Sequence, residues 1–169
     1  MRIVVVGGSG RIGSALVEHL RVAGHEAVPA SPSTGVDTLT GAGVAEALTG
    51  AQVVVDVSNS PSFADTEVMA FFTTSTRTLL DAARAAGVAH YVALSIVGTD
   101  ILPDSGYLRA KTAQEELITA SGLPFTIVRA TQFYEFIEPI ADGTTADGVV
   151  TLPDAQFQPV AAADVSALL

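Results

Sequence analysis

The stretch Gly7-Gly8-Ser9-Gly10-Arg11-Ile12-Gly13 follows directly on residues 1–6, an apolar run rich in isoleucine and valine. Such an uninterrupted run predicts a strand that is buried on both faces, as in a parallel sheet. After the glycines, residues 11–23 have the apolar spacing of an amphipathic helix. A strand, a glycine-rich turn and a helix in this order are the context in which a dinucleotide pyrophosphate binds at a helix N-terminus. An ordinary structural turn is the alternative interpretation.

The three glycines at positions 7, 10 and 13 have different physical roles in this interpretation. The turn must be tight, the backbone must approach the pyrophosphate closely, and the helix must pack near the strand. The loop as a whole supplies the first group of expected cofactor contacts, namely Gly7, Ser9, Gly10, Arg11, Ile12 and Gly13.

Segments of strand character alternate with segments of helical character along the rest of the chain. The expected strands are residues 26–29, 52–57, 90–95 and 125–129, and the expected helices are residues 44–48, 68–86, 106–120 and 132–140. A strand or hairpin is expected near 149–152, an extended segment near 157–160 and a helix from Ala162, while the loop 31–40 leaves room for a short strand near Val36. This order predicts one Rossmann-like α/β domain over residues 1–169, a doubly wound parallel sheet with helices on both faces.

Composition restricts the class of partner. The formal net charge of −10 opposes non-specific binding to nucleic acid, which depends on Lys and Arg. No apolar run approaches the roughly 20 residues that span a bilayer. The chain has no cysteine and its three histidines are scattered, so we expect no disulfide and no metal site, and a cytoplasmic location is compatible with this composition. Small-molecule partners are expected, and a homodimer remains open.

The end of the second expected strand bears on which nicotinamide cofactor binds. An acidic residue there would hold the adenosine 2′-hydroxyl of NAD, but residues 29–34 contain none. Hydroxyls at Ser31 and Ser33 could instead contact a 2′-phosphate, and Arg11 could neutralise it. The sequence therefore favours NADP over NAD, although the serines could simply shape a turn.

The single lysine of the chain, Lys111, lies four residues after Tyr107. This spacing puts both side chains on one helical face. An ammonium can lower the pKa of a nearby phenol, which can then act as a proton donor to a developing alkoxide. A surface Tyr–Lys pair without catalytic meaning is the alternative interpretation.

The glycine loop, Ser95 at the end of a strand and the Tyr107/Lys111 pair together resemble the short-chain dehydrogenase/reductase superfamily. More narrowly, residues 88–98 and 121–133 are similar to the fifth and sixth strands of its atypical, NmrA-like NAD(P)-binding branch. The resemblance implies a Rossmann fold and an NAD(P)-dependent oxidoreductase that transfers hydride to or from a small carbonyl or alcohol. It also implies that Ser95 steadies the substrate oxygen, Tyr107 exchanges the proton, and Lys111 binds the cofactor ribose.

The remaining expected cofactor contacts come from loops. Asp37 could reach the adenine or could form a turn, and residues 56–61 could contact the cofactor or could form a capped loop. The resemblance places the loop after residue 129 beside the nicotinamide. The corresponding candidates are Asp37, Val57, Ser58, Thr131 and Phe133.

Two features depart from the resembling family. Many active members carry an asparagine on the long helix for a proton relay, but the matching position is Phe72, and no amide is expected nearby. Members also run some tens of residues beyond the position of Leu169, so a truncated chain or an open pocket is expected. These departures keep a second hypothesis open, a non-catalytic NADP(H)-binding sensor or regulator of the NmrA-like type.

Overall fold

The computed structural model of the protein describes residues 1–101, 104–152 and 157–169. Its central sheet contains the strands β1 (Arg2–Val6), β2 (Glu26–Ala30), β3 (Val53–Asp56), β4 (His90–Ile96) and β5 (Phe125–Ala130). The helices are α1 (Arg11–Val22), α2 (Val44–Leu48), α3 (Asp65–Ala86), α4 (Gly106–Thr119), α5 (Ile137–Gly143) and α6 (Ala162–Leu168). Short 3-10 turns occupy η1 (Pro32–Thr34) and η2 (Tyr134–Phe136), and β6 (Thr145–Ala146) pairs with β7 (Val149–Val150).

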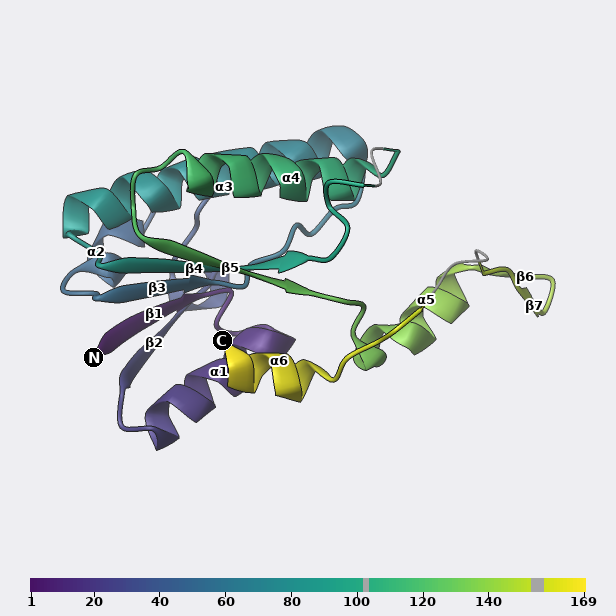
Figure 1. Ribbon diagram of the computed structural model, residues 1–169, viewed down its shortest axis with the longest axis horizontal. Helices are drawn as coiled ribbons and strands as arrows, with labels where there is room; N and C mark the ends of the chain where they lie inside the picture. Colours follow the sequence, from purple (N-terminus) through teal and green to yellow (C-terminus); the bar gives the residue numbers. More distant parts are fainter. Residues whose placement is uncertain (102–103, 153–156) are drawn as a thin grey trace.

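All five strands of the central sheet are parallel, in the order β2-β1-β3-β4-β5. Helices α2, α3 and α4 cover one face, and α1 and α6 cover the other (Figure 1). This arrangement confirms the predicted doubly wound Rossmann-like fold. Because the strands are parallel, their carboxyl ends meet at one edge, where ligands of open α/β sheets bind.

The core has two parts, one on each face of the sheet. Side chains from alternate positions of β1 point to opposite faces: Val4 packs beneath α2 and α3, and Val5 packs against α1. Both valines are fully buried, which explains why this strand is apolar without alternation.

Helix α3 begins three residues earlier than the sequence predicts, at Asp65, and ends at Ala86 as expected. Its buried residues include Val68, Phe72 and Leu79, so the apolar side of this helix belongs to the core. Gly87 adopts φ = 70° as the C-terminal cap, a conformation that favours glycine.

The expectation of a short strand near Val36 is wrong. Gly35 has φ = 84°, and the N–H of Asp37 donates to the carbonyl of Ala42, so this segment turns back on itself. Val36 is apolar because its side chain is buried in the core beneath α2 and α3. The β-branched side chain is therefore explained by packing rather than by strand pairing.

The C-terminal part has the hairpin, the extended segment and the final helix that the sequence predicts, but the helix expected over residues 132–140 is divided into the 3-10 turn η2 and the helix α5, which begins only at Ile137. Asp147 and Gly148, both with positive φ, join β6 and β7 into a hairpin that projects from the body (Figure 1). The expected extended segment forms a bridge between Phe133 and Val160, and α6 then packs against α1. The buried hydroxyl of Ser166 donates to the carbonyl of Ile12, which ties α6 to the start of α1.

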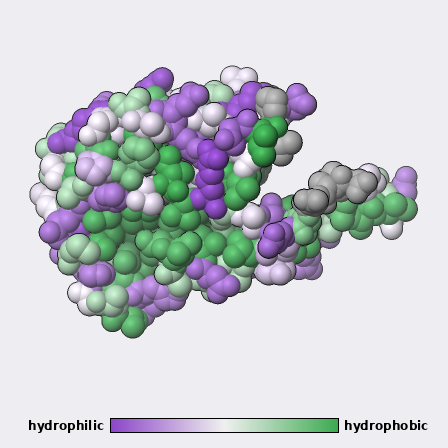
Figure 2. Space-filling view, in the orientation of Figure 1, coloured by the Kyte–Doolittle hydropathy of each residue, from purple (hydrophilic) through white to green (hydrophobic). Residues whose placement is uncertain are grey.

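Hydrophobic residues gather over the middle of one face, where β5 forms the sheet edge, and over the projecting hairpin (Figure 2). Phe125, Val149 and Val150 are among the exposed side chains in these regions. Within the described residues, we find no helix with the length and apolar character that crossing a membrane requires.

Candidate functional site

The glycine loop is shaped by close backbone contacts. A Cβ at Gly13 would lie 2.2 Å from the carbonyl oxygen of Gly7, so a side chain there would push α1 away from the loop. Gly7 has φ = 80°, and a Cβ there would lie 2.9 Å from the backbone nitrogen of Ser58. Gly7 and Gly13 therefore perform the turn and close-packing roles expected of them.

The first turn of α1 fits a phosphate group. Its N-cap residue, Gly10, provides no side-chain hydrogen bond, and the N-terminal N–H groups of a helix lack intrahelical partners. Those N–H groups and the positive end of the helix dipole favour a bound anion. Because the glycines of the loop have no Cβ atom, a phosphate can approach the N–H groups at the start of α1 closely. The loop residues are therefore suited to hold a dinucleotide pyrophosphate.

The expected 2′-phosphate contacts differ in accessibility. Ser31 is buried, and its hydroxyl accepts a hydrogen bond from the N–H of Ser9 at 3.1 Å, so this serine fixes the glycine loop. Ser33 and Arg11 are exposed. The guanidinium of Arg11 lies 5.6 Å from the ring centre of Phe136. Of the three expected contacts, Ser33 and Arg11 are therefore the residues that are accessible to a cofactor 2′-phosphate.

Asp37 forms a turn. Its carboxylate accepts a hydrogen bond from the N–H of Leu39 at 2.8 Å, and this bond lowers the pKa of Asp37 below its usual value. The contacts support the turn-forming alternative for this residue.

The loop after β3 is also held by its own side chains. Asp56 is 1% exposed and accepts hydrogen bonds from the N–H and hydroxyl of Ser58 at 3.0 and 2.6 Å. The side-chain oxygen of Asn59 accepts from the N–H of Ser60. These bonds form the capped loop expected as one alternative, and they place Ser58 and Val57 directly against Gly7.

Tyr107 lies at the start of α4, which Ser105 caps by accepting a hydrogen bond from the N–H of Leu108. The phenol ring lies between Phe63 and Phe72, with ring centres 5.4 and 5.8 Å away. Its hydroxyl donates to the side-chain oxygen of Asn59 at 2.9 Å. The long helix offers no amide at Phe72, as the sequence indicates, but the loop after β3 brings the amide of Asn59 to this tyrosine.

Burial raises the pKa of Tyr107 to about 12, against a smaller lowering effect of the hydrogen bond to Asn59. The expected lowering of this pKa by Lys111 is thus wrong for the protein in this state. The phenol keeps its proton over the whole physiological range, as a proton donor must.

Lys111 on α4 is 3% exposed. Its ammonium donates to the carbonyl of Leu94 at 2.9 Å and to the side-chain oxygen of Gln114, and it lies 4.5 Å from the ring centre of Phe72. Burial lowers the pKa of Lys111 to about 8, partly offset by the negative charges of Asp56 and Glu115. The interpretation as a surface Tyr–Lys pair is wrong for this lysine.

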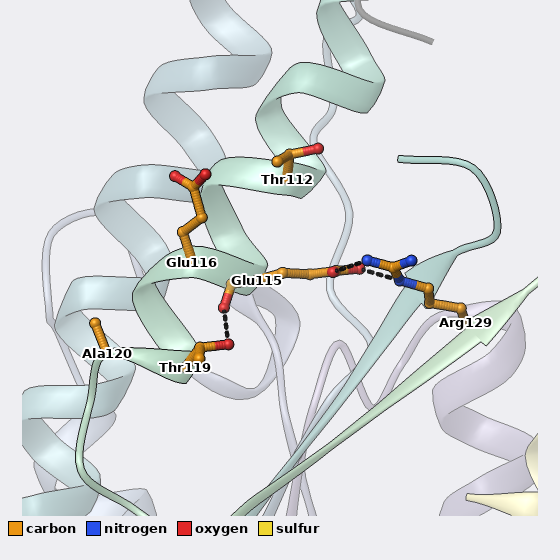
Figure 3. Close-up of a pocket in the computed structure, with 6 residues that line it drawn as sticks. All are labelled: Thr112, Glu115, Glu116, Thr119, Ala120 and Arg129. Carbon is orange, nitrogen blue, oxygen red and sulfur yellow. Dashed lines mark hydrogen bonds and ion pairs between the residues drawn. The ribbon is translucent and has the colours of Figure 1, made fainter. Parts of the chain in front are cut away.

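Ser95 is 2% exposed, and its hydroxyl donates to the carboxylate of Glu115 at 2.5 Å. Glu115 points from α4 toward Arg129 on β5 and forms an ion pair with it at 2.6 Å (Figure 3). Hydrogen bonding to Glu115 raises the pKa of Arg129 above its usual value. The serine hydroxyl is therefore directed toward this ion pair, whereas the phenol of Tyr107 faces Asn59.

A hollow of about 380 Å³ lies beside the same ion pair. It is lined by Thr112, Glu115, Glu116, Thr119, Ala120 and Arg129 (Figure 3). None of the residues expected to bind cofactor or to transfer a proton lines it, so we do not place the reacting groups there.

The loop after β5 carries the remaining candidates. Thr131 is half-buried directly after the strand, and the ring centre of Phe133 lies 6.2 Å from that of Phe136. Glu135 accepts a hydrogen bond from the N–H of Ala162 and so fixes the start of α6.

The structure thus brings Tyr107, Lys111 and Phe72 together and joins Tyr107 to Asn59. The sequence indicated Asp56 and Asn59 only as members of the segment 56–61, without a role of their own, and did not indicate Gln114. The signal for the first two was their position at or just beyond the end of a buried strand, and Gln114 offered only its place one turn after Lys111 on the predicted helix.

A family model described as NAD(P)H-binding matches residues 7–169 of the chain. Among curated proteins, the (4-alkanoyl-5-oxo-2,5-dihydrofuran-3-yl)methyl phosphate reductase of Streptomyces griseus is 30% identical over 161 residues. That match covers 88% of this chain and 54% of the relative. The chain therefore spans about half the length of this curated relative.

Solved structures resemble the chain over most of its length. The triphenylmethane reductase of Citrobacter sp. complexed with NADP(H) has a TM-score of 0.76 and 18% identity, covering 99% of this chain and 63% of that one. A short-chain dehydrogenase/reductase superfamily protein from Agrobacterium tumefaciens with bound NAD has a TM-score of 0.68 and 26% identity, covering 88% and 54%. The first likeness supports the fold, and the second also agrees with the predicted superfamily.

Proposed function

The chain belongs to the NAD(P)H-binding family, and we propose that it is an NAD(P)H-dependent oxidoreductase that reduces a small carbonyl compound with Tyr107 as the proton donor. The observation that carries this proposal is the pairing on α4 of a protonated phenol with a buried ammonium, both in contact with Phe72. The curated relative named above is a reductase, which supports the same class of reaction.

The bound cofactor would supply the hydride, and the residues of this chain would bind, orient and donate the proton. The loop 7–13 and the first turn of α1 would hold the pyrophosphate. As the carbonyl carbon gains hydride, its oxygen would take the proton of Tyr107, and solvent would then restore that proton. Lys111 would bind the cofactor ribose, and Asn59 would hold the phenol in place until a substrate oxygen replaces it.

The test is turnover of NADPH with a panel of small carbonyl compounds, compared between the native chain and Tyr107→Phe. We expect the variant to bind NADPH normally and to lose roughly 100-fold or more in rate, the usual contribution of a general acid. Thr74→Ala, at an exposed position of α3, is the control. Equal rates for Tyr107→Phe and the native chain would remove Tyr107 from the reaction.

We assign NADP as the preferred cofactor, because residues 29–34 at the end of β2 contain no acidic residue, and Ser33 in this segment and Arg11 at the start of α1 are both exposed. Replacing Arg11 by Ala should weaken NADPH binding about tenfold and leave NADH binding nearly unchanged, since one charged contact to a phosphate would be lost. Arg77→Ala, an exposed arginine on α3, is the matched control. Equal weakening of both cofactors would contradict the assignment.

A second candidate function is supported by the same contacts. The phenol of Tyr107 and the hydroxyl of Ser95 both donate to groups of the protein itself. A non-catalytic NADP(H)-binding sensor would need neither hydroxyl for chemistry. Tight NADPH binding without turnover of any carbonyl, and without an effect of Tyr107→Phe, would favour the sensor.

A further inference from the structure

A chain of buried polar groups runs from Lys111 into the centre of the sheet. The ammonium donates to the Oε1 atom of Gln114, and the Nε2 atom of Gln114 donates to the Oδ2 atom of Asp56 at 3.1 Å. Tyr91 also donates to this Oδ2 atom at 3.1 Å. Gln114, Asp56 and Tyr91 are each no more than 1% exposed. None of these three residues has a role in the proposed reaction so far.

The direction of the Gln114 amide is fixed by its two neighbours. An ammonium only donates and a carboxylate only accepts, so the amide must turn its oxygen to Lys111 and its NH₂ group to Asp56. In this orientation the amide dipole has its negative end at the cation and its positive end at the anion. Gln114 therefore connects two buried charges that make no direct hydrogen bond with each other.

Asp56 receives donors on both oxygens. Gln114 and Tyr91 donate to Oδ2, and the N–H and hydroxyl of Ser58 donate to Oδ1. Four donors satisfy the hydrogen-bonding capacity of this buried carboxyl group, because each replaces a lost contact with water. The nearby Asp56 side chain in turn favours the charged form of Lys111, which burial opposes, and so raises the pKa of the lysine.

The other groups around the ammonium cannot take over this role. Leu94 offers a neutral carbonyl and Phe72 offers a ring face. Glu115 also favours the charged form, but its oxygens are bound by Ser95 and Arg129, and its effect is smaller than that of Asp56. Asp56 is therefore the main anionic support of the single lysine.

We propose that Gln114 and Asp56 are positioning residues for Lys111, with the Gln114 amide relaying the buried carboxylate to the ammonium and holding it beside β4. The link to the site rests on the proposed function, in which Lys111 binds the cofactor. The same carboxylate fixes Ser58, whose backbone packs on Gly7, so one buried group supports both the lysine and the glycine loop.

The test uses the fact that Lys111 is the only lysine. With lysine labelled by ¹³C at Cε, the native chain gives one side-chain signal, and its pH titration reports the pKa of Lys111 directly. Gln114→Met keeps the length of the side chain and removes the oxygen and the NH₂ group. Asp56→Asn keeps the shape and removes the charge. Both should lower the pKa of Lys111 by about one pH unit or more.

Two further variants separate positioning from simple damage to the core. Gln114→Glu puts a carboxylate beside the ammonium and should raise the pKa, opposite to Gln114→Met. Glu116→Gln removes an exposed charge from the same helix and should leave the titration unchanged. If Gln114→Met does not fold, the opposite shifts of Gln114→Glu and Asp56→Asn decide the question.

An unchanged titration in Gln114→Met or in Asp56→Asn would overturn the proposal, because the relay needs both links. The titration requires neither cofactor nor turnover. Failure to bind NADPH, with the expected titration shifts, would therefore defeat the proposed function and leave the buried network standing. Normal NADPH turnover without those shifts would support the proposed function and would overturn the positioning role of Gln114 and Asp56.

Discussion

The glycine loop and helix α4 face the same candidate site, but they are built in different ways. The loop is determined by backbone contacts, such as the approach that leaves no space for a Cβ at Gly13. The α4 region is determined by side chains from three separate segments, α4, β3 and β4, which join Lys111, Gln114, Asp56 and Tyr91. A loop of this kind is specified by nearby residues, whereas the side-chain cluster needs the whole sheet to be assembled first.

This difference leads to different responses to substitution. A side chain added at a closely packed glycine of the loop should displace the backbone, and it should reduce both cofactor binding and the free energy of unfolding. A change in the cluster should alter charge and its dependence on pH, while the backbone stays in place. The following predictions separate the two regions, beginning with the largest effect.

Gly13→Ala tests the loop. A Cβ there would lie 2.2 Å from the carbonyl of Gly7, so α1 must move and the free energy of unfolding should fall by about 3 kcal/mol. NADPH binding should be lost at the same time, because the phosphate cradle moves with α1. Gly143→Ala, where a Cβ would meet no atom within 4 Å, is the matched control. Urea denaturation and calorimetric titration check both effects, and native-like values for Gly13→Ala would show that the loop is not closely packed.

The charge of Lys111 tests the cluster. Its pKa is about 8 in the folded chain and near 10.5 when the residue is exposed. Between these values the unfolded chain binds more protons, so stability should rise with pH by about 1 kcal/mol per pH unit between pH 8 and 10. Below pH 8 the lysine is charged in both states and this slope disappears. The ordinary tyrosine pKa of about 10 lies at the upper end of this window, so the slope due to Lys111 is clearest between pH 8 and 9.

Urea denaturation at several pH values measures this slope. Lys111→Met removes the titrating group and should flatten the curve between pH 8 and 10, whatever its effect on stability at a single pH. A curve with the same slope in both proteins would mean that the lysine is not perturbed by burial.

Ser166→Ala tests the contact between α6 and the loop region. The buried hydroxyl donates to the carbonyl of Ile12 at 3.2 Å and to that of Ala162, and its loss should cost about 1 kcal/mol of stability. NADPH affinity should change less than twofold, because α1 remains in place. Thr74→Ala on α3 is the exposed control, and thermal unfolding compares the two variants. A large loss of NADPH affinity in Ser166→Ala would show that α6 helps to set the loop geometry.

Much of the fold could be predicted from the sequence because its signals are local. The apolar run 1–6, the glycines that follow it and the stops at glycines such as Gly87 are short-range patterns with direct backbone causes. Val36 misled the prediction because a β-branched residue suits a strand and also suits a buried position in a turn. Only the surrounding core distinguishes the two.

The candidate site could be predicted only in part. The spacing of Tyr107 and Lys111 marks one helical face, so their proximity follows from the sequence. Asn59 is 48 positions away from its partner Tyr107, and Asp56 is 58 positions away from Gln114. Such contacts depend on the order of strands in the sheet and have no local signature. The pKa of Tyr107 was mispredicted for the same reason, since burial by α3 dominates it.

The most direct test of the central claim is a calorimetric titration of the native chain with NADPH and, separately, with NADH. The account predicts saturable binding of NADPH at one site per chain, with NADH bound more weakly. Absence of binding by either nucleotide would contradict the account at its base, because every catalytic role proposed above depends on a dinucleotide held at the glycine loop.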